Sequence, residues 1–232
     1  MRIAWAITGA GHFIKESYEV LLKLKNNNPD MKVTIFISGA GYEVLKMYGL
    51  FDSLNKISPG GYMEEIFLEK DQGYSCPKIG RFLMDKYDVL VVTPVTSNSI
   101  AKIAHGIADT LVTNVVTQAV KGSVPVYVVP VDISGVIRSE LPFNIDRDIC
   151  KQCYICLPGD QCPKQAITDE PQIELLLCNG CGICTSLCQY DAIKGGEVVL
   201  RVRDLDCKNV QILKELDEIT VLEHPEDIMG IF

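Results

Sequence analysis

Two regularly spaced sets of cysteines constrain this chain more than any other feature of its sequence. Both sets have the spacing C-x2-C-x2-C followed by one more cysteine. The first set is Cys150, Cys153, Cys156 and Cys162, and the second is Cys178, Cys181, Cys184 and Cys188. Soft thiolates favour zinc or iron–sulfur clusters. Zinc sites usually use two pairs of ligands, whereas triplets with a separate fourth cysteine are typical of iron–sulfur clusters. The spacing therefore predicts iron–sulfur clusters, with zinc or disulfides as weaker alternatives.

The amino-terminal residues argue against disulfides as the use of these cysteines. The stretch MRIAWAITGAGH is a short apolar run ended by glycines, which predicts a buried strand and not a secretory signal peptide. Outside an oxidising compartment, clustered cysteines more often bind metal. No stretch reaches the roughly 18 apolar residues that a membrane span needs. We therefore expect a cytoplasmic metalloprotein without a membrane span.

The net charge bears on the classes of partner that the chain can bind. The formal charge is −8 at pH 7. An acidic protein is repelled by nucleic acid and by anionic membranes, so we expect neither as a partner. An acidic surface can instead dock a basic redox partner, although simple solubility explains the charge equally well.

The position of the cysteines divides the chain into two parts. Nine of the ten cysteines follow Phe143, and we place the boundary near Leu141. The sequence thus predicts one domain over residues 1–140 and a smaller α+β domain, with a C-terminal tail, over residues 141–232. In the first part, apolar runs alternate with helical spacing. This alternation predicts an α/β domain with a Rossmann-like parallel sheet that is covered by helices on both faces.

Hydrophobic periodicity places the individual elements. Strands are predicted over residues 3–7, 33–37, 89–92, 112–116, 124–129 and 198–202. Helices are predicted from about residues 14, 44 and 100 onward, and a final helix is predicted over residues 206–216.

Small and hydroxyl residues follow three of these strands, at residues 8–11, 38–41 and 93–99. Ligands of parallel sheets bind at the carboxyl ends of the strands, and a glycine turn before a helix presents N–H groups to an anion. The first turn lacks the third glycine of G-x-G-x-x-G, so a simple tight turn remains an alternative. Residues 93–99 hold more hydroxyls and amides than helix capping needs, which indicates a ligand.

The stretch TPVTSNSIAKIAHGIAD at residues 93–109 resembles the signature of the flavoprotein family related to cysteine decarboxylases. The resemblance covers about residues 1–132. It implies a Rossmann-like fold, bound FMN, and trimers or multiples of trimers with the flavin at subunit contacts. The FMN contacts that it implies are Gly9, Ala10, Gly11, His12, Ser38, Gly39, Thr93, Thr96, Ser97, Asn98, Ser99, Thr117 and Gln118.

The decarboxylases of this family carry a P-x-M-N-x-x-M-W segment that this chain lacks. Residues 130–133 read Pro-Val-Asp-Ile instead, which argues against cysteine decarboxylation. His12 and His105 are the candidate catalytic proton donors, although capped or surface histidines are more common.

Residues 143–200 resemble the two-cluster bacterial ferredoxin domain, in which the fourth cysteine of each run ligates the other cluster. Five residues instead of three precede Cys162, and Gln189 stands where proline is usual. Two 4Fe–4S clusters are implied, one on Cys150, Cys153, Cys156 and Cys188, the other on Cys178, Cys181, Cys184 and Cys162. Cys76 and Cys207 are expected to be ordinary thiols, although the polar loop around Cys76 allows a place near the active site.

The pairing of the two modules resembles the archaeal iron–sulfur dihydromethanopterin reductase (acceptor) family. This resemblance implies a homo-oligomeric oxidoreductase that takes electrons from a donor such as ferredoxin. They would pass through the clusters to FMN and reduce 7,8-dihydromethanopterin to tetrahydromethanopterin. No residue identifies the pterin. A non-enzymatic archaeoflavoprotein that exchanges electrons with ferredoxin is the alternative, and a flavin-dependent decarboxylase is less favoured.

Overall fold

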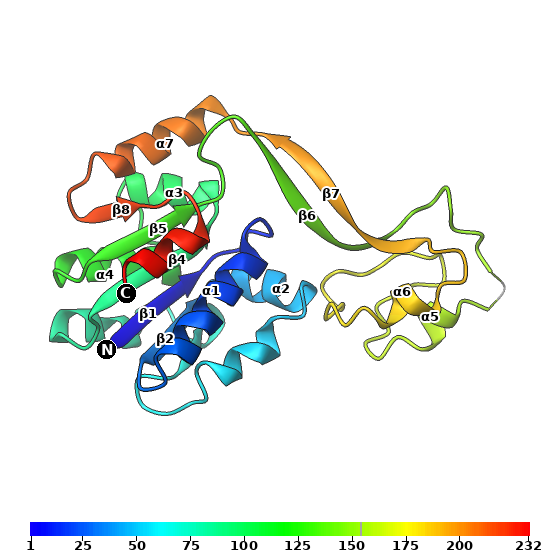
Figure 1. Ribbon diagram of the computed structural model, residues 1–232, viewed down its shortest axis with the longest axis horizontal. Coiled ribbons are helices and arrows are strands. Elements are labelled where there is room, and N and C mark those ends of the chain that lie inside the picture. Colours follow the sequence, from blue (N-terminus) through cyan, green and yellow to red (C-terminus); the bar gives the residue numbers. More distant parts are fainter. Residues whose placement is uncertain (154) are drawn as a thin grey trace.

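The computed structural model describes residues 1–153 and 155–232. The chain forms a larger α/β domain and a small cysteine-rich head, joined by a two-stranded arm (Figure 1). Both termini lie on the larger domain. No helix in the described part of the chain has the length and apolar character needed to cross a membrane.

A six-stranded parallel sheet with the order β3-β2-β1-β4-β5-β8 forms the centre of the larger domain. The strands are β1 (Arg2–Ile7), β2 (Lys32–Ile37), β3 (Ile66–Leu68), β4 (Val89–Val95), β5 (Val126–Pro130) and β8 (Ile219–Val221). Every residue of β4 is buried. Such continuous burial is the property of a parallel sheet covered on both faces, and it explains the unbroken β-branched runs in the sequence.

Helices cover both faces of this sheet. They are α1 (Ile14–Asn27), α2 (Gly39–Met47), α3 (Ser97–Ala104), α4 (Leu111–Lys121) and α7 (Asp204–Lys214), with short 3-10 turns at residues 51–56, 69–71, 77–84 and 225–230. One core cluster packs α1 against Trp5, and the other packs α4 and α7 against Phe36. The predicted Rossmann-like class is thus confirmed.

The predicted strand over residues 112–116 is wrong, because these residues belong to α4. Val112, Val115, Val116 and Ala119 recur at helical spacing and are all buried. Thr110 caps the helix by accepting a hydrogen bond from the Thr113 N–H at 3.2 Å. The β-branched run therefore marks the buried face of a helix, and its local strand propensity is overridden by packing.

The predicted division at residue 140 assigns all later residues to the second domain, but in the structure the carboxyl-terminal residues pack on the larger domain. They return to the larger domain, where β8 pairs with β5 and α7 buries Val210 and Leu213 in the core. The head is therefore an insertion between β5 and α7. The predicted helix over 206–216 is confirmed as α7, but periodicity does not say on which domain it packs.

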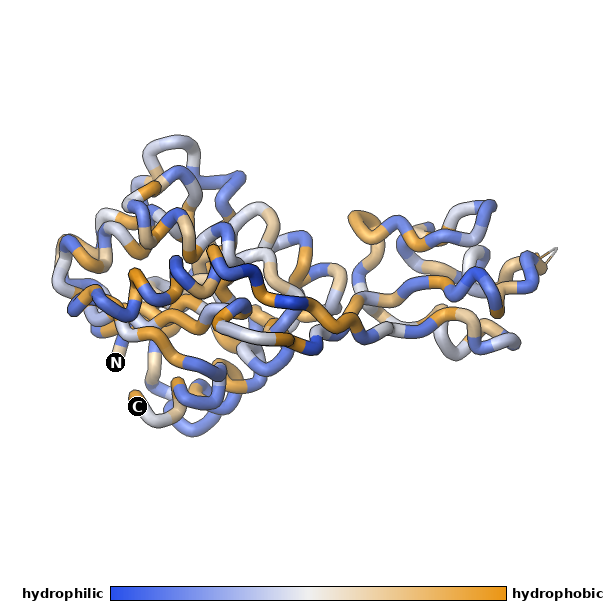
Figure 2. Tube along the Cα trace, turned by 90° about the horizontal axis from the view of Figure 1, so that it is seen from above, coloured by the Kyte–Doolittle hydropathy of each residue, from blue (hydrophilic) through white to orange (hydrophobic). Residues whose placement is uncertain are grey.

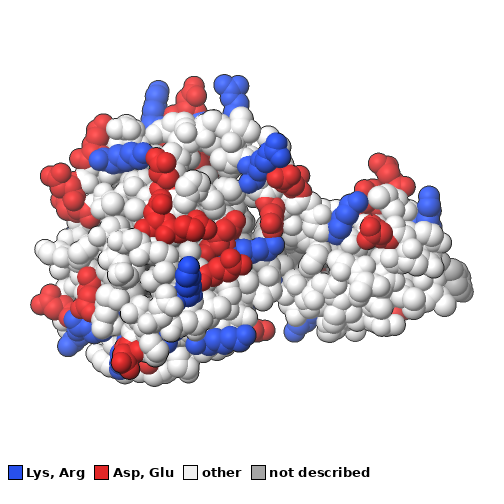
Figure 3. Space-filling view, in the orientation of Figure 1, with Lys and Arg blue, Asp and Glu red and all other residues white. Residues whose placement is uncertain are grey.

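The arm consists of β6 (Val136–Ile145) and β7 (Ile193–Arg201), which pair antiparallel from Val136↔Arg201 to Ile145↔Ile193. Figure 2 shows hydrophobic residues along it between the two domains. The head carries two short helices, α5 (Leu157–Asp160) and α6 (Ile183–Leu187). Its surface in Figure 3 shows few charged side chains compared with the larger domain.

Candidate active site: two cysteine cavities and a strand-end cradle

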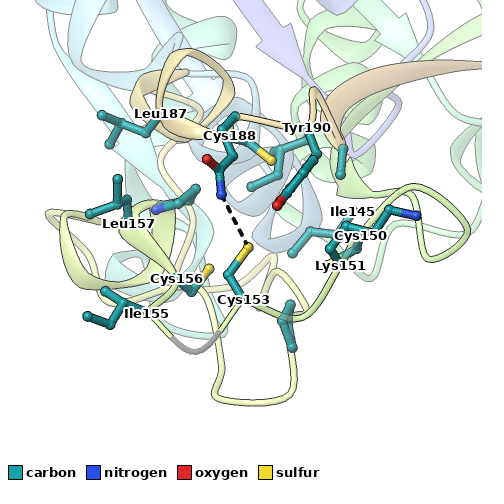
Figure 4. A pocket seen from close by; sticks show the side chains of 15 residues that line it. Ile145, Cys150, Lys151, Cys153, Ile155, Cys156, Leu157, Leu187, Cys188 and Tyr190 are labelled. Carbon is teal, nitrogen blue, oxygen red and sulfur yellow. Dashed lines mark hydrogen bonds between the residues drawn. The ribbon is translucent and has the colours of Figure 1, made fainter.

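Four cysteines of the head surround one cavity, shown in Figure 4. They are Cys150, Cys153, Cys156 and Cys188, and Ile145, Ile193 and Leu187 are among the apolar residues that also line it. The Gln189 amide nitrogen donates to the Cys153 Sγ at 3.7 Å. Gln189 stands where the ferredoxin pattern has proline, and its side chain donates a hydrogen bond to a cysteine sulfur, which a proline side chain cannot do.

The other four spaced cysteines, Cys162, Cys178, Cys181 and Cys184, line a second cavity. The Ala166 N–H donates to the Cys162 Sγ at 3.3 Å, and the Gly180 N–H donates to the Cys178 Sγ at 3.4 Å. Burial raises the pKa of the Cys184 thiol, and the nearby Cys178 and Cys181 raise it further. Thiolates this close together favour a cationic centre between them.

Each triplet therefore shares its cavity with the fourth cysteine of the other set. In the described residues, no three His, Cys, Asp or Glu side chains converge closely enough to hold a single metal ion. Each set instead encloses a space with apolar walls and amide hydrogen bonds to sulfur. These are the surroundings that tune iron–sulfur clusters, so the donor set fits two such groups.

Cys76 and Cys207 lie outside both cavities. Cys76 is buried in the core beneath the sheet, and burial raises the pKa of its thiol. Cys207 is part of α7. The loop position of Cys76 thus does not bring it to the cysteine cavities.

The glycine turn after β1 packs closely against α2. A Cβ on Gly9 would lie 2.5 Å from the Ala40 Cβ, and one on Gly11 would lie 2.6 Å from the Tyr48 hydroxyl oxygen. Packing against Ala40 is therefore enough to require glycine at residue 9, whereas a larger residue at position 11 would have to displace the Tyr48 side chain. Ser38 caps α2 by accepting a hydrogen bond from the Gly41 N–H at 3.0 Å.

Hydroxyl groups join the carboxyl ends of β1 and β4. The Thr8 Oγ1 donates to the Pro94 carbonyl at 2.8 Å and accepts from the Thr96 N–H at 2.9 Å. Buried Thr93 shares a 2.8 Å hydrogen bond with Ser17. These bonds fix the first turn of α3 beside the glycine turn.

One residue is enough to cap α3, as the sequence indicated. The Thr96 hydroxyl oxygen accepts from the Ser99 N–H at 3.2 Å, and the Ser97 hydroxyl bonds the Asp132 carboxylate. Asn98 is exposed, and no side-chain hydrogen bond to it exists among the described residues. Its amide, with the free N–H groups of the first helical turn, remains available to an anionic ligand.

Glu69 is a residue of this region that the sequence did not single out. Its carboxylate accepts hydrogen bonds from the Gly39 N–H and the Leu111 N–H, each at 2.6 Å, and so bridges the amino-terminal ends of α2 and α4. A carboxylate is stabilised at a helix amino terminus by the helix dipole. The N–H of Gly39, a predicted FMN contact, is therefore already engaged within the protein.

The glycine turn at residues 8–11, Ser38 and residues 93–99 together form what we call the strand-end cradle. Three predicted site residues lie away from this cradle. Thr117 and Gln118 belong to the carboxyl-terminal half of α4, and the Thr117 hydroxyl donates to the Thr113 carbonyl at 3.0 Å. His105 follows the last residue of α3, at the end opposite the cradle, and its Nε2 lies 3.3 Å from the Asn209 Oδ1. Within one chain, these residues do not meet the other predicted contacts.

His12 lies on the wall of a third cavity, of about 350 Å³, beside the glycine turn. The cavity also receives Phe13, Ile137 from the arm, and His224 from the segment after β8. His224 was missed because the sequence gives no sign that the carboxyl-terminal residues return to this edge of the sheet. Burial is the main cause that lowers the pKa of His12.

The head touches the larger domain close to this region. Gly49, just after α2, and Gly180, between two cysteines of the second set, meet backbone to backbone. The Tyr48 hydroxyl donates to the Glu140 carbonyl at 2.6 Å, and Lys15 pairs with the Glu140 carboxylate. The second cysteine set therefore lies on the side of the head that faces the larger domain.

Comparison with known proteins identifies two families in this chain. The Flavoprotein family matches residues 1–137, and the 4Fe-4S binding domain matches residues 171–194, which include the second cysteine set.

Relatives of full length are also found. A protein of Methanosarcina mazei named dihydromethanopterin reductase (acceptor) is 59% identical over 235 residues, which cover 100% of this chain and 98% of the relative. A protein of the same name from Methanocaldococcus jannaschii is 46% identical over 237 residues, covering 100% and 96%.

Among solved structures, Burkholderia xenovorans DmrB in complex with FMN, described as a cubic protein cage for redox transfer, has a similar fold. The TM-score is 0.63 at 24% identity, over 99% of this chain and 92% of that chain.

Proposed function

Since this chain belongs to the Flavoprotein family, we propose that it is an iron–sulfur flavoenzyme that reduces 7,8-dihydromethanopterin to tetrahydromethanopterin. Electrons enter from an external donor such as ferredoxin, pass through two 4Fe–4S clusters and reach FMN. The two full-length relatives named dihydromethanopterin reductase (acceptor) support this substrate. The structural observation that carries the proposal is the contact between Gly180, which lies within the second cysteine set, and Gly49, which follows α2.

That contact connects the cysteine-rich head to the strand-end cradle through packed residues. Gly180, whose N–H donates to the Cys178 Sγ, lies against Gly49. The preceding residue, Tyr48, lies directly against Gly11 of the glycine turn. A donor group in the head and an acceptor group in the cradle are thereby held in one arrangement, as electron transfer within one molecule needs.

The cradle fits the phosphate and ribityl parts of FMN through its donors. Asn98, Ser97 and the first-turn N–H groups of α3 would bind the phosphate, and Gly9–Gly11 would allow the backbone to approach it. The Gly39 N–H contributes only if Glu69 moves away. When bound, FMN supplies the conversion between single-electron and two-electron transfer. The protein binds it, orients it and excludes water.

The two cysteine cavities would hold one cluster each, on Cys150, Cys153, Cys156 and Cys188 and on Cys178, Cys181, Cys184 and Cys162. Amide hydrogen bonds to Cys162, Cys178 and Cys153 would stabilise the charge on sulfur and so set the reduction potentials. The cysteine set nearer the larger domain would hold the cluster that donates to FMN, and the outer set would hold the cluster that receives electrons from the external donor.

We also propose that the chain forms trimers or multiples of trimers with FMN near the subunit contacts. The Burkholderia relative is described as a cage, and this supports assembly into a homo-oligomer. Thr117 and Gln118, which lie away from the cradle of their own chain, would then contact FMN of a neighbouring subunit. A monomeric mass in light scattering would contradict this assembly.

An anaerobic reoxidation experiment tests the function. The protein is reduced with a limiting amount of dithionite, 7,8-dihydromethanopterin is added, and flavin and cluster absorbance are followed. We expect both absorbances to recover as tetrahydromethanopterin forms. Recovery with oxidised ferredoxin, but not with the dihydropterin, would favour the non-enzymatic carrier. A carrier and a reductase share the clusters and FMN, so only the acceptor separates them.

A further inference from the structure

The cavity beside His12 is separate from the donors that fit the FMN phosphate. It lies between the glycine turn, the segment after β5, the first residues of the arm and the segment after β8. Its volume of about 350 Å³ is within the range of small-molecule sites. Segments that are distant in sequence converge here, and two of them bring histidines.

Phe13 has a backbone conformation that is unusual for a bulky residue. Its φ is 65° and its ψ is 5°, in the left-handed region that costs an aromatic residue strain. This conformation holds its ring 3.9 Å from the His12 ring and 5.6 Å from the His224 ring, measured between centroids. The strained residue thus lies next to both imidazoles at the wall of the cavity.

The charged groups around His12 come from each neighbouring element. Burial is the main influence and lowers the pKa of His12, Glu16 of α1 and Asp132 after β5 act in the opposite direction, and His224 adds to the lowering. Arg138 of the arm and Glu223 also line the cavity. A histidine is the side chain best suited to hold and release a proton under physiological conditions, and His12 is placed to do so at this cavity.

We propose that this cavity receives the pterin ring and that His12 delivers the proton that its reduction consumes. The inference rests on the proposed function. Conversion of a dihydropterin to a tetrahydropterin adds a hydride to the carbon and a proton to the nitrogen of one C=N bond. Bound reduced FMN would supply the hydride, while the His12 imidazolium gives its proton to that nitrogen and becomes neutral. Phe13 packs against His12, the proton donor, and its ring also lies against that of His224.

A substitution that fills the cavity tests the binding part. Ile137→Trp places a large side chain in it, whereas Val136→Trp is the matched control, because Val136 is 64% exposed and does not line the cavity. Successive side chains of a strand point to opposite faces. Binding of 7,8-dihydromethanopterin to the oxidised holoenzyme is measured by equilibrium dialysis, and FMN content by release on denaturation.

We expect Ile137→Trp to weaken dihydropterin binding about tenfold or more with FMN content unchanged, and Val136→Trp to change binding less than about twofold. Loss of FMN from the Ile137→Trp protein alone would assign the cavity to the flavin and overturn the proposal. Equal binding in both variants would also overturn it. If the wild-type protein does not react with the dihydropterin at all, the proposed function fails instead.

His12→Gln tests the proton donor without filling the cavity. We expect flavin reoxidation by dihydropterin to slow about 100-fold with binding retained, a loss typical of general-acid removal. In the wild-type protein the rate should fall as pH rises through the His12 pKa, which lies below its ordinary value. This pH dependence should vanish in His12→Gln and persist in His224→Gln. An unchanged pH profile in His12→Gln would overturn the assignment of the donor.

Discussion

Gly49 and Gly180 lie backbone against backbone where the head meets the larger domain. A Cβ on Gly180 would be 2.6 Å from the Gly49 backbone nitrogen, and one on Gly49 would be 3.2 Å from the Gly180 carbonyl oxygen. Both residues have positive φ, 70° and 65°. Glycine is therefore required twice over at this contact, for conformation and for space.

Gly180→Ala is expected to separate the head from α2. Backbone strain alone costs roughly 1 kcal/mol, and the steric clash adds displacement of the cysteine loop. Reduction of the flavin by reduced ferredoxin should slow in stopped-flow absorbance, while iron and FMN contents stay at wild-type levels. Gly73→Ala is the control, since Gly73 also has positive φ, 62°, but nothing lies within 4 Å. Similar slowing in both variants would contradict a role for the contact.

Cys153→Ala is expected to remove one of the two clusters. Iron content should fall to about half, because three cysteines do not hold the cluster stably, and FMN should remain bound. Iron assay and the electron paramagnetic resonance of the reduced protein measure this. Cys207→Ala, which changes a thiol in α7, should keep the full iron content. A full iron content in Cys153→Ala would contradict the assignment of this ligand.

Asn98→Leu is expected to weaken FMN binding by about tenfold, because an exposed amide beside the first turn of α3 is lost. Folding should be little changed, since Asn98 makes no side-chain contact of the capping kind that Thr96 makes. Fluorescence titration of the apoprotein with FMN measures the affinity. Asn26→Leu provides an exposed asparagine in α1 as the control. Equal affinities in the two variants would place the phosphate elsewhere.

Glu65→Gln is expected to lower stability at neutral pH by about 1 kcal/mol. The two hydrogen bonds from the Arg81 guanidinium, at 2.7 and 2.8 Å, lower the pKa of Glu65 below its ordinary value of 4.5. A lowered carboxyl pKa stabilises the fold above that ordinary value, and this contribution is lost as pH falls through the folded pKa.

The difference in unfolding free energy between wild type and Glu65→Gln should therefore shrink as the pH of a denaturant titration is lowered from about 7 to about 3. A difference that stays constant over this range would show that Glu65 acts through its shape and not its charge.

The cysteine sets and the parallel sheet could be predicted because their signals are local. The spacing of the cysteines is visible in a short stretch, and buried strands such as β4 are continuous apolar runs. The prediction of a strand over residues 112–116 was wrong, because α4 presents its β-branched residues to the core at helical spacing. Local propensity cannot decide such a case without the neighbouring elements.

Residues whose partners are distant in sequence could not be found in the same way. Glu69 bonds backbone groups that are 30 and 42 positions away. His224 lines the same cavity as His12 only because β8 joins the edge of the sheet beside β5. A glutamate or histidine in a polar stretch looks like any surface residue until the topology is known. The gathering of glycine and hydroxyl residues at the strand ends was thus predictable, but the distant side chains that join them were not.

Insertion of the head ahead of β8 has a consequence for biosynthesis. The ribosome completes all eight spaced cysteines before it makes the last strand of the larger domain, which spans Ile219–Val221. Folding during translation proceeds from the amino terminus, so the sheet stays one strand short while the head emerges. The cysteine-rich head is therefore complete on the nascent chain while the larger domain is still open along its β5 edge.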